Sequence, residues 1–136
     1  MIEPGKIRLE RLYSAAPSAV WRALVTPELL AAWWAPGDIR AEVGHAFHLD
    51  MGPWGKQPCE VLEVLPEKKL VFSFAKGSLD TTLTFTLEPS GTGTRLVLEH
   101  AGFDLESPLA KRAFDGMRSG WPGVLARLEP VLGKTS

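Results

Sequence analysis

The chain has 136 residues, of which 45% are hydrophobic and 23% are charged, and its formal net charge is −1. This length suits one domain, and the composition is typical of soluble globular proteins. The near-zero charge argues against broad electrostatic binding of nucleic acid or acidic membranes, and the single Cys59 excludes an internal disulfide.

The N-terminus and the hydropathy of the chain also limit where it functions. Residues 1–10 carry several charges and contain no apolar run of signal-peptide length. No stretch approaches the roughly eighteen apolar residues that a membrane helix needs. We therefore expect one cytoplasmic domain over residues 1–136, with an ordered core at about 6–132 and no membrane insertion.

The first quarter of the chain predicts a strand followed by two short helices. Residues 6–13 alternate between apolar and charged side chains, which is the period of a half-buried strand. Pro17 can start a short helix, and Thr26 followed by Pro27 repeats the start signal for a second helix. This second helix is expected to end at about Trp34, before a proline and a glycine.

From Asp38 the apolar period changes to two, which predicts a series of antiparallel strands joined by turns. The clearest pattern lies near the end of the series, where Leu83, Phe85 and Leu87 alternate with threonines. The predicted strands cover residues 38–43, 47–51, 60–65, 70–74, 82–88 and 95–100.

The last predicted helix runs from Ser107, a capping residue followed by proline, to about Leu132. Three glycines and Pro122 weaken its middle and predict a kink at residues 118–121, which either follows a curved sheet or shapes a cavity wall. Its apolar stripe consists of Leu109, Phe114, Met117, Trp121, Leu125, Leu128 and Leu132.

This order of elements is one strand, two helices, five or six antiparallel strands and a long helix. The economical arrangement is an α+β fold in which a curved antiparallel sheet wraps around the C-terminal helix. Sheet and helix need not pack tightly along their whole length, so such a fold leaves room for an internal cavity.

Several short motifs resemble a known family. They are VWRAL at 20–24, TPELL at 26–30, WWAP at 33–36, GTRL at 93–96 and HAGF at 100–103. Together they resemble the activator of heat-shock protein 90 ATPase homologue family, within the START/SRPBCC superfamily, over roughly residues 6–130. The resemblance implies the helix-grip fold of the birch-pollen allergen, with a hydrophobic cavity that takes a small apolar or amphipathic ligand.

His100 is the most informative polar residue, because strand alternation points it to the same side as Leu96 and Leu98. Its imidazole either meets a polar group of a ligand or bonds to a neighbouring side chain or loop carbonyl. Trp54, at the centre of a loop, is a candidate lid or rim of the cavity, while most other aromatic side chains also suit a packed core. The predicted ligand-binding set is Trp33, Trp34, Phe47, Trp54, Phe72, Phe74, Phe85, Leu98, His100, Phe114, Met117 and Trp121.

No pattern indicates catalytic residues, a metal or a cofactor. His45 and His48 would point to opposite faces of one strand, and the closely spaced carboxylates suit solvated surfaces. The leading hypothesis is a module that binds a hydrophobic or amphipathic small molecule, as a monomer or homodimer without nucleic acid. The alternatives are a co-chaperone-like partner that stimulates a heat-shock protein 90 ATPase, and a cyclase, aromatase or hydrolase of the same superfamily.

Overall fold

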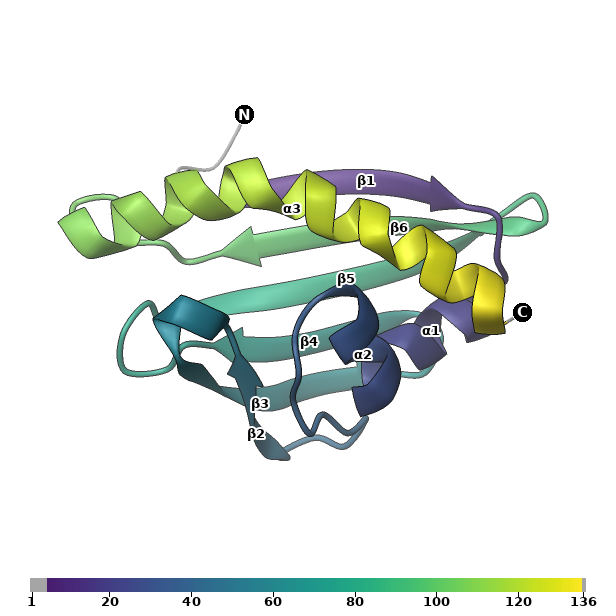
Figure 1. Cartoon of the computed structure of the whole chain (residues 1–136), viewed down its shortest axis with the longest axis horizontal. Helices are drawn as coiled ribbons and strands as arrows, with labels where there is room; N and C mark the ends of the chain where they lie inside the picture. Colours follow the sequence, from purple (N-terminus) through teal and green to yellow (C-terminus); the bar gives the residue numbers. More distant parts are fainter. Residues whose placement is uncertain (1–4, 136) are drawn as a thin grey trace.

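The computed structural model describes residues 5–135 and shows a curved antiparallel sheet with two short helices and one long C-terminal helix (Figure 1). The predicted α+β helix-grip fold is confirmed, including the two helices after the first strand. Residues 1–4, which belong to the charged N-terminus discussed above, and residue 136 lie outside the described part of the chain.

The six strands form a single sheet in which the first strand pairs with the last. Every neighbouring pair is antiparallel, and the order across the sheet is β1-β6-β5-β4-β3-β2. The strands are β1 (Ile7–Tyr13), β2 (Ala46–Asp50), β3 (Lys56–Leu65), β4 (Lys69–Phe74), β5 (Thr81–Ser90) and β6 (Gly93–Ala101).

The predicted strand at residues 38–43 is wrong. Ile39 is buried as the alternation requires, but the chain then turns, and the Glu42 N–H donates to the Arg40 carbonyl at 2.9 Å. This segment carries the chain from the second helix to the sheet edge, and the bridge to Leu49 is formed by Gly37, directly before it. An alternating pattern over a few residues therefore does not distinguish a strand from a connection with one buried anchor.

The two short helices, α1 (Pro17–Val25) and α2 (Pro27–Trp33), each begin at the predicted proline. They are fastened to each other because the Trp33 indole N–H donates to the Ala23 carbonyl at 2.9 Å. This bond fixes the end of α2, from which the chain enters the helix–sheet interior at Trp34.

The C-terminal helix, α3 (Pro108–Thr135), is continuous through Pro122 and packs against α1, α2 and β1. Its direction changes near the middle in Figure 1, in the part where the sequence predicts a kink. Trp121, Leu125 and Leu128 are buried as predicted, but Leu109 is 61% exposed because the first turn buries Ala110 instead. None of the described helices is long and apolar enough to cross a membrane.

We expect Gly116→Ala to raise the free energy of unfolding by about 0.5–1 kcal/mol, because glycine is a poor helix former and a Cβ at Gly116 meets no atom within 4 Å. Urea denaturation measures this change. Gly93→Ala is the matched control, because its Cβ would collide with the Tyr13 carbonyl oxygen and should destabilise the fold. A loss of stability in Gly116→Ala would show that the bend in α3 depends on that glycine.

Candidate functional site

Five rings contact one another in a row through the space between α3 and the sheet, and we call them the ring series. The series begins and ends with half-buried side chains, Phe114 on α3 and Trp34 after α2, and its three inner rings are buried. The centroid distances are 5.3 Å for Phe114–Phe103, 4.6 Å for Phe103–His100, 6.0 Å for His100–Trp121 and 5.0 Å for Trp121–Trp34.

His100 forms the polar centre of the ring series. The Trp121 indole N–H donates to His100 Nδ1 at 3.2 Å, so the neutral imidazole carries its proton on Nε2. That Nε2–H donates to Thr81 Oγ1 at 2.9 Å, and the Thr81 hydroxyl donates to the Phe74 carbonyl at 3.2 Å. Both ring nitrogens of His100 are thus bonded within the protein, which is the second of the two alternatives that the sequence left open.

The surroundings of His100 strongly favour the neutral form. The side chain is completely buried, and the rings of Phe74 and Phe103 pack against it. Burial removes the imidazolium from water and lowers the pKa of His100 from 6.5 to about 3. Among the described residues, the other buried polar side chains are Thr81 and Thr94, so no carboxylate lies in the interior to act with the imidazole.

The Trp34 ring packs against aromatic side chains of the inner sheet face and of α3. Its ring centroid lies 6.4 Å from Phe72, 6.2 Å from Phe74 and 5.0 Å from Trp121. The residue follows the last helical position of α2 in a non-helical conformation, with φ −130° and ψ −79°. The backbone thus leaves the helix at the point where the ring enters the space below α3.

The structure brings ten of the twelve predicted ligand-binding residues into one core cluster, and the buried His100 packs against the Phe74 and Trp121 rings of that cluster. Phe114, Met117 and Trp34 are half-buried members of this cluster, and the others are buried. Trp54 is not part of it: its side chain is 77% exposed on the short 3-10 helix η1 (Gly52–Trp54).

Two members of the site were missed by the sequence reasoning. Phe103 lies in the HAGF motif, which pointed to the family but follows the last strand and shows no periodicity. Thr81 lies at an alternating position of β5 together with Leu83 and Phe85. This alternation was the signal that could have assigned Thr81 to the inner face of the sheet. Alternation gives the face of Thr81 but not its contact with His100, which depends on the register between β5 and β6.

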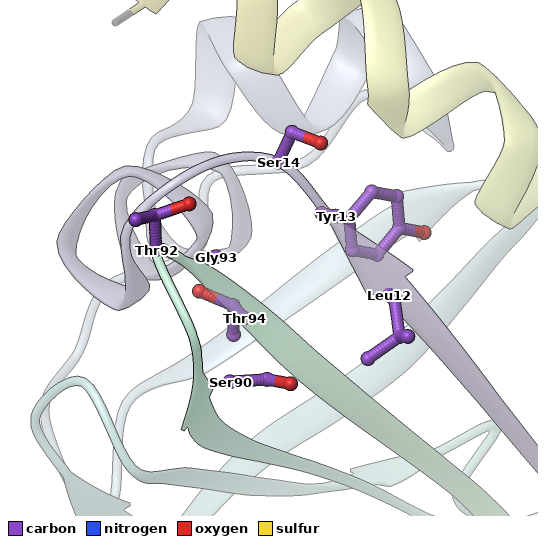
Figure 2. A pocket seen from close by; sticks show the side chains of 7 residues that line it. All are labelled: Leu12, Tyr13, Ser14, Ser90, Thr92, Gly93 and Thr94. Atoms are coloured by element: carbon purple, nitrogen blue, oxygen red, sulfur yellow. The ribbon is translucent and has the colours of Figure 1, made fainter.

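Two surface hollows among the described residues are lined by none of the predicted ligand-binding residues. One, of about 190 Å³, is formed by the end of β1 and the hairpin between β5 and β6 (Figure 2). The other, of about 370 Å³, lies between Pro36 and the edge strand β2 and includes His48 and Asp50. No group of three or more His, Cys, Asp or Glu side chains in the described residues is arranged to hold a metal ion.

A curved antiparallel sheet that grips a long helix over an aromatic interior defines a helix-grip domain. The family model for activator of Hsp90 ATPase homolog 1-like proteins matches residues 14–133, and the chain belongs to this family. No curated protein matches the chain at a significant level.

Solved structures share the fold over almost the whole chain. A protein from Mesorhizobium loti is 36% identical, with a TM-score of 0.84 and coverage of 96% of this chain and 98% of that one. A Bacillus halodurans protein is 29% identical, with a TM-score of 0.82 and coverage of 97% and 99%. The Aha1 dimer from Colwellia psychrerythraea is 19% identical, with a TM-score of 0.74 and coverage of 97% and 96%, and it shares the fold.

The pKa of His100 predicts a dependence of stability on pH. Between about 6.5 and about 3, the unfolded imidazole binds a proton that the folded one does not bind. The contribution of His100 to the free energy of unfolding is therefore fully present above pH 6.5. It is lost as the pH falls towards 3, by up to roughly 1.4 kcal/mol per pH unit.

We expect the free energy of unfolding to fall by roughly 2 kcal/mol more in the wild type than in His100→Gln between about pH 7 and about pH 5. Urea denaturation at the two pH values measures the difference. The control is His48→Gln, whose side chain is exposed and which should behave like the wild type. An equal loss in wild type and His100→Gln would contradict the buried, neutral imidazole.

Proposed function

We propose that the chain binds a hydrophobic or amphipathic small molecule between α3 and the inner face of the sheet, and that Trp34 fills this site when no ligand is present. The observation that carries the proposal is the position of Trp34, which is half-buried and rests on Phe72, Phe74 and Trp121. A half-buried aromatic side chain that packs on other aromatic rings makes a contact that a flat apolar ligand can replace.

Trp34 can leave this position at a small structural cost. It stands outside the last turn of α2, while the preceding Trp33 is held by its bond to the Ala23 carbonyl and by the Arg127 Nε–H that donates to the Trp33 carbonyl at 3.2 Å. A buried tryptophan covers about 150–250 Å² at about 25 cal/mol per Å², so uncovering the half-buried ring costs on the order of 2–3 kcal/mol. A ligand of similar apolar area offsets this cost.

The proposed ligand is held mainly by apolar contacts. Every buried side-chain nitrogen or oxygen in the described residues already has a hydrogen-bond partner, so the interior offers no free polar group. His100 then acts indirectly, by holding Trp121 in the wall of the site through the 3.2 Å bond. The polar end of an amphipathic ligand would remain beside the half-buried Trp34 and Met117, where the site meets solvent.

A second candidate function, a co-chaperone-like interaction, is favoured by the family and by Trp54. This exposed side chain is carried on a well-bonded loop, in which the Gln57 amide donates to the Trp54 carbonyl at 2.7 Å and the Met51 N–H to the Gly55 carbonyl at 2.9 Å. Exposed aromatic residues on rigid loops are typical interface anchors. This function would require that the chain stimulate a heat-shock protein 90 ATPase and that Trp54→Ala remove the effect.

The binding proposal is tested by titrating the chain with the apolar dye anilinonaphthalene sulfonate and following dye fluorescence. We expect Trp34→Ala to lower the Kd of the dye at least about tenfold, because the ring that competes with the dye is gone. The Kd of Trp34→Phe, which keeps a smaller ring in place, should lie between the Kd of the wild type and that of Trp34→Ala.

Trp54→Ala is the matched control and should leave the Kd unchanged, since Trp54 lies outside the core cluster. Cooperative urea unfolding of each variant, with a stoichiometry of about one dye per chain, separates a defined site from a loosened core. If Trp34→Ala binds the dye no more tightly than the wild type, the proposed site is wrong.

A further inference from the structure

The two edges of the sheet differ in how their backbone groups are bonded. At the β2 edge the Asp50 N–H donates to the Pro36 carbonyl at 2.8 Å, and Gly37 bridges Leu49, so a neighbouring segment covers the strand. At the other edge, β1 pairs with β6 on one side, and no further strand formed by residues 5–135 lies beyond it (Figure 1). Within residues 5–135, none of the hydrogen bonds outside the sheet ladder ends on the β1 backbone.

An open edge of seven residues can pair with another strand unless its side chains oppose it. The alternation of the β1 side chains determines whether the edge favours or opposes such pairing. Arg8 and Glu10 point to the outer face, where their side chains are 49% and 39% exposed, and Leu9 lies between them on the inner face. A charge of each sign therefore flanks one central apolar residue.

This pattern is complementary to itself in one antiparallel register. If Leu9 of two copies lie opposite each other, Arg8 faces Glu10 of the second copy, and Glu10 faces Arg8 of the second copy. A shift of the two-fold axis by one residue places Glu10 opposite Glu10, and a further step places Arg11 opposite Arg11. Opposite charges across a strand pair stabilise it by about 0.2–1 kcal/mol, whereas like charges destabilise it.

The same register also accounts for the exposed Leu12, whose side chain is 65% exposed on the outer face of β1. In the pair centred on Leu9, Leu12 lies opposite Lys6 of the second copy. The aliphatic stem of a lysine can cover an apolar neighbour while its ammonium group remains in water.

We propose that β1 is the surface through which two copies of this chain associate, joining their sheets into one antiparallel sheet with Leu9 at the two-fold axis. The interface is isologous, because each copy contributes the same strand. The backbone groups of the open edge supply the hydrogen bonds. The Arg8–Glu10 pairs between copies, which replace the ion pair that these two side chains form within one chain, select the register.

The register is tested with single cysteines. In Leu9→Cys the two cysteines face each other across the axis, where opposed Cβ atoms lie about 4.5–5.5 Å apart, close to disulfide range. In Arg11→Cys the two positions are separated by four residues along the strands, or about 13 Å. The native Cys59 is buried and is retained in both variants.

We expect oxidised glutathione to convert Leu9→Cys into a disulfide-linked dimer on a non-reducing gel, while Arg11→Cys and the wild type remain single chains. Cross-linking of both variants to the same extent would indicate random collision and overturn the proposal. Absence of cross-linking in Leu9→Cys would overturn it too, provided that the free thiol reacts with a maleimide.

Sedimentation equilibrium measures the association without a cross-link. We expect Arg8→Glu to raise the dimer Kd about tenfold or more, because it places two glutamates opposite each other at two symmetric positions. Lys69→Glu changes the net charge equally at a position far from β1 in the sheet order and should leave the Kd unchanged. A wild type that stays monomeric at millimolar concentration, or pairs only with an added peptide strand, would contradict association of two copies.

Discussion

The hydrogen bond from the Trp121 indole to His100 joins the C-terminal helix to the sheet at the point where the helix is intrinsically weakest. Pro122 has no N–H to give to the Arg118 carbonyl, so the helix backbone alone does not fix its path there. The bond continues through His100 and Thr81 to the Phe74 carbonyl, and all its members are buried. Because an unpaired buried polar group is costly, this chain of bonds holds α3 at one depth and rotation over the sheet.

This constraint divides the interior into a part held by hydrogen bonds and a part held by ring contacts. Trp121 and His100 are tied to each other and to the sheet, whereas the adjacent Trp34 is held by ring contacts alone within the interactions described for its side chain. Entry of a ligand through His100 would leave buried donors and acceptors without partners, but entry past Trp34 exchanges one apolar surface for another. The proposed binding site follows from this difference in cost.

The sequence was sufficient to predict the fold and the inward direction of His100, because strand alternation and the start signals of helices are local properties. It was insufficient at residues 38–43, where one buried anchor, Ile39, imitates a strand within a connection. The partner of His100 could not be identified either, because Thr81 lies on another strand and pairing between strands depends on register. The sequence placed Trp54 in a loop but could not show whether its side chain covers the interior or faces solvent, because that depends on the path of η1, where it is 77% exposed.

The central claim is that a ligand displaces Trp34 and leaves the Trp121–His100–Thr81 bonds intact. The most direct test is nitrogen-15 NMR of the tryptophan indole and histidine imidazole groups during titration with anilinonaphthalene sulfonate. We expect the signals of the Trp34 indole and of the neighbouring Trp121 indole to shift with dye occupancy, while His100 remains neutral with its proton on Nε2 and so still accepts from Trp121 at Nδ1. A change in the His100 tautomer, or a Trp34 signal that the dye leaves unaffected, would contradict the claim.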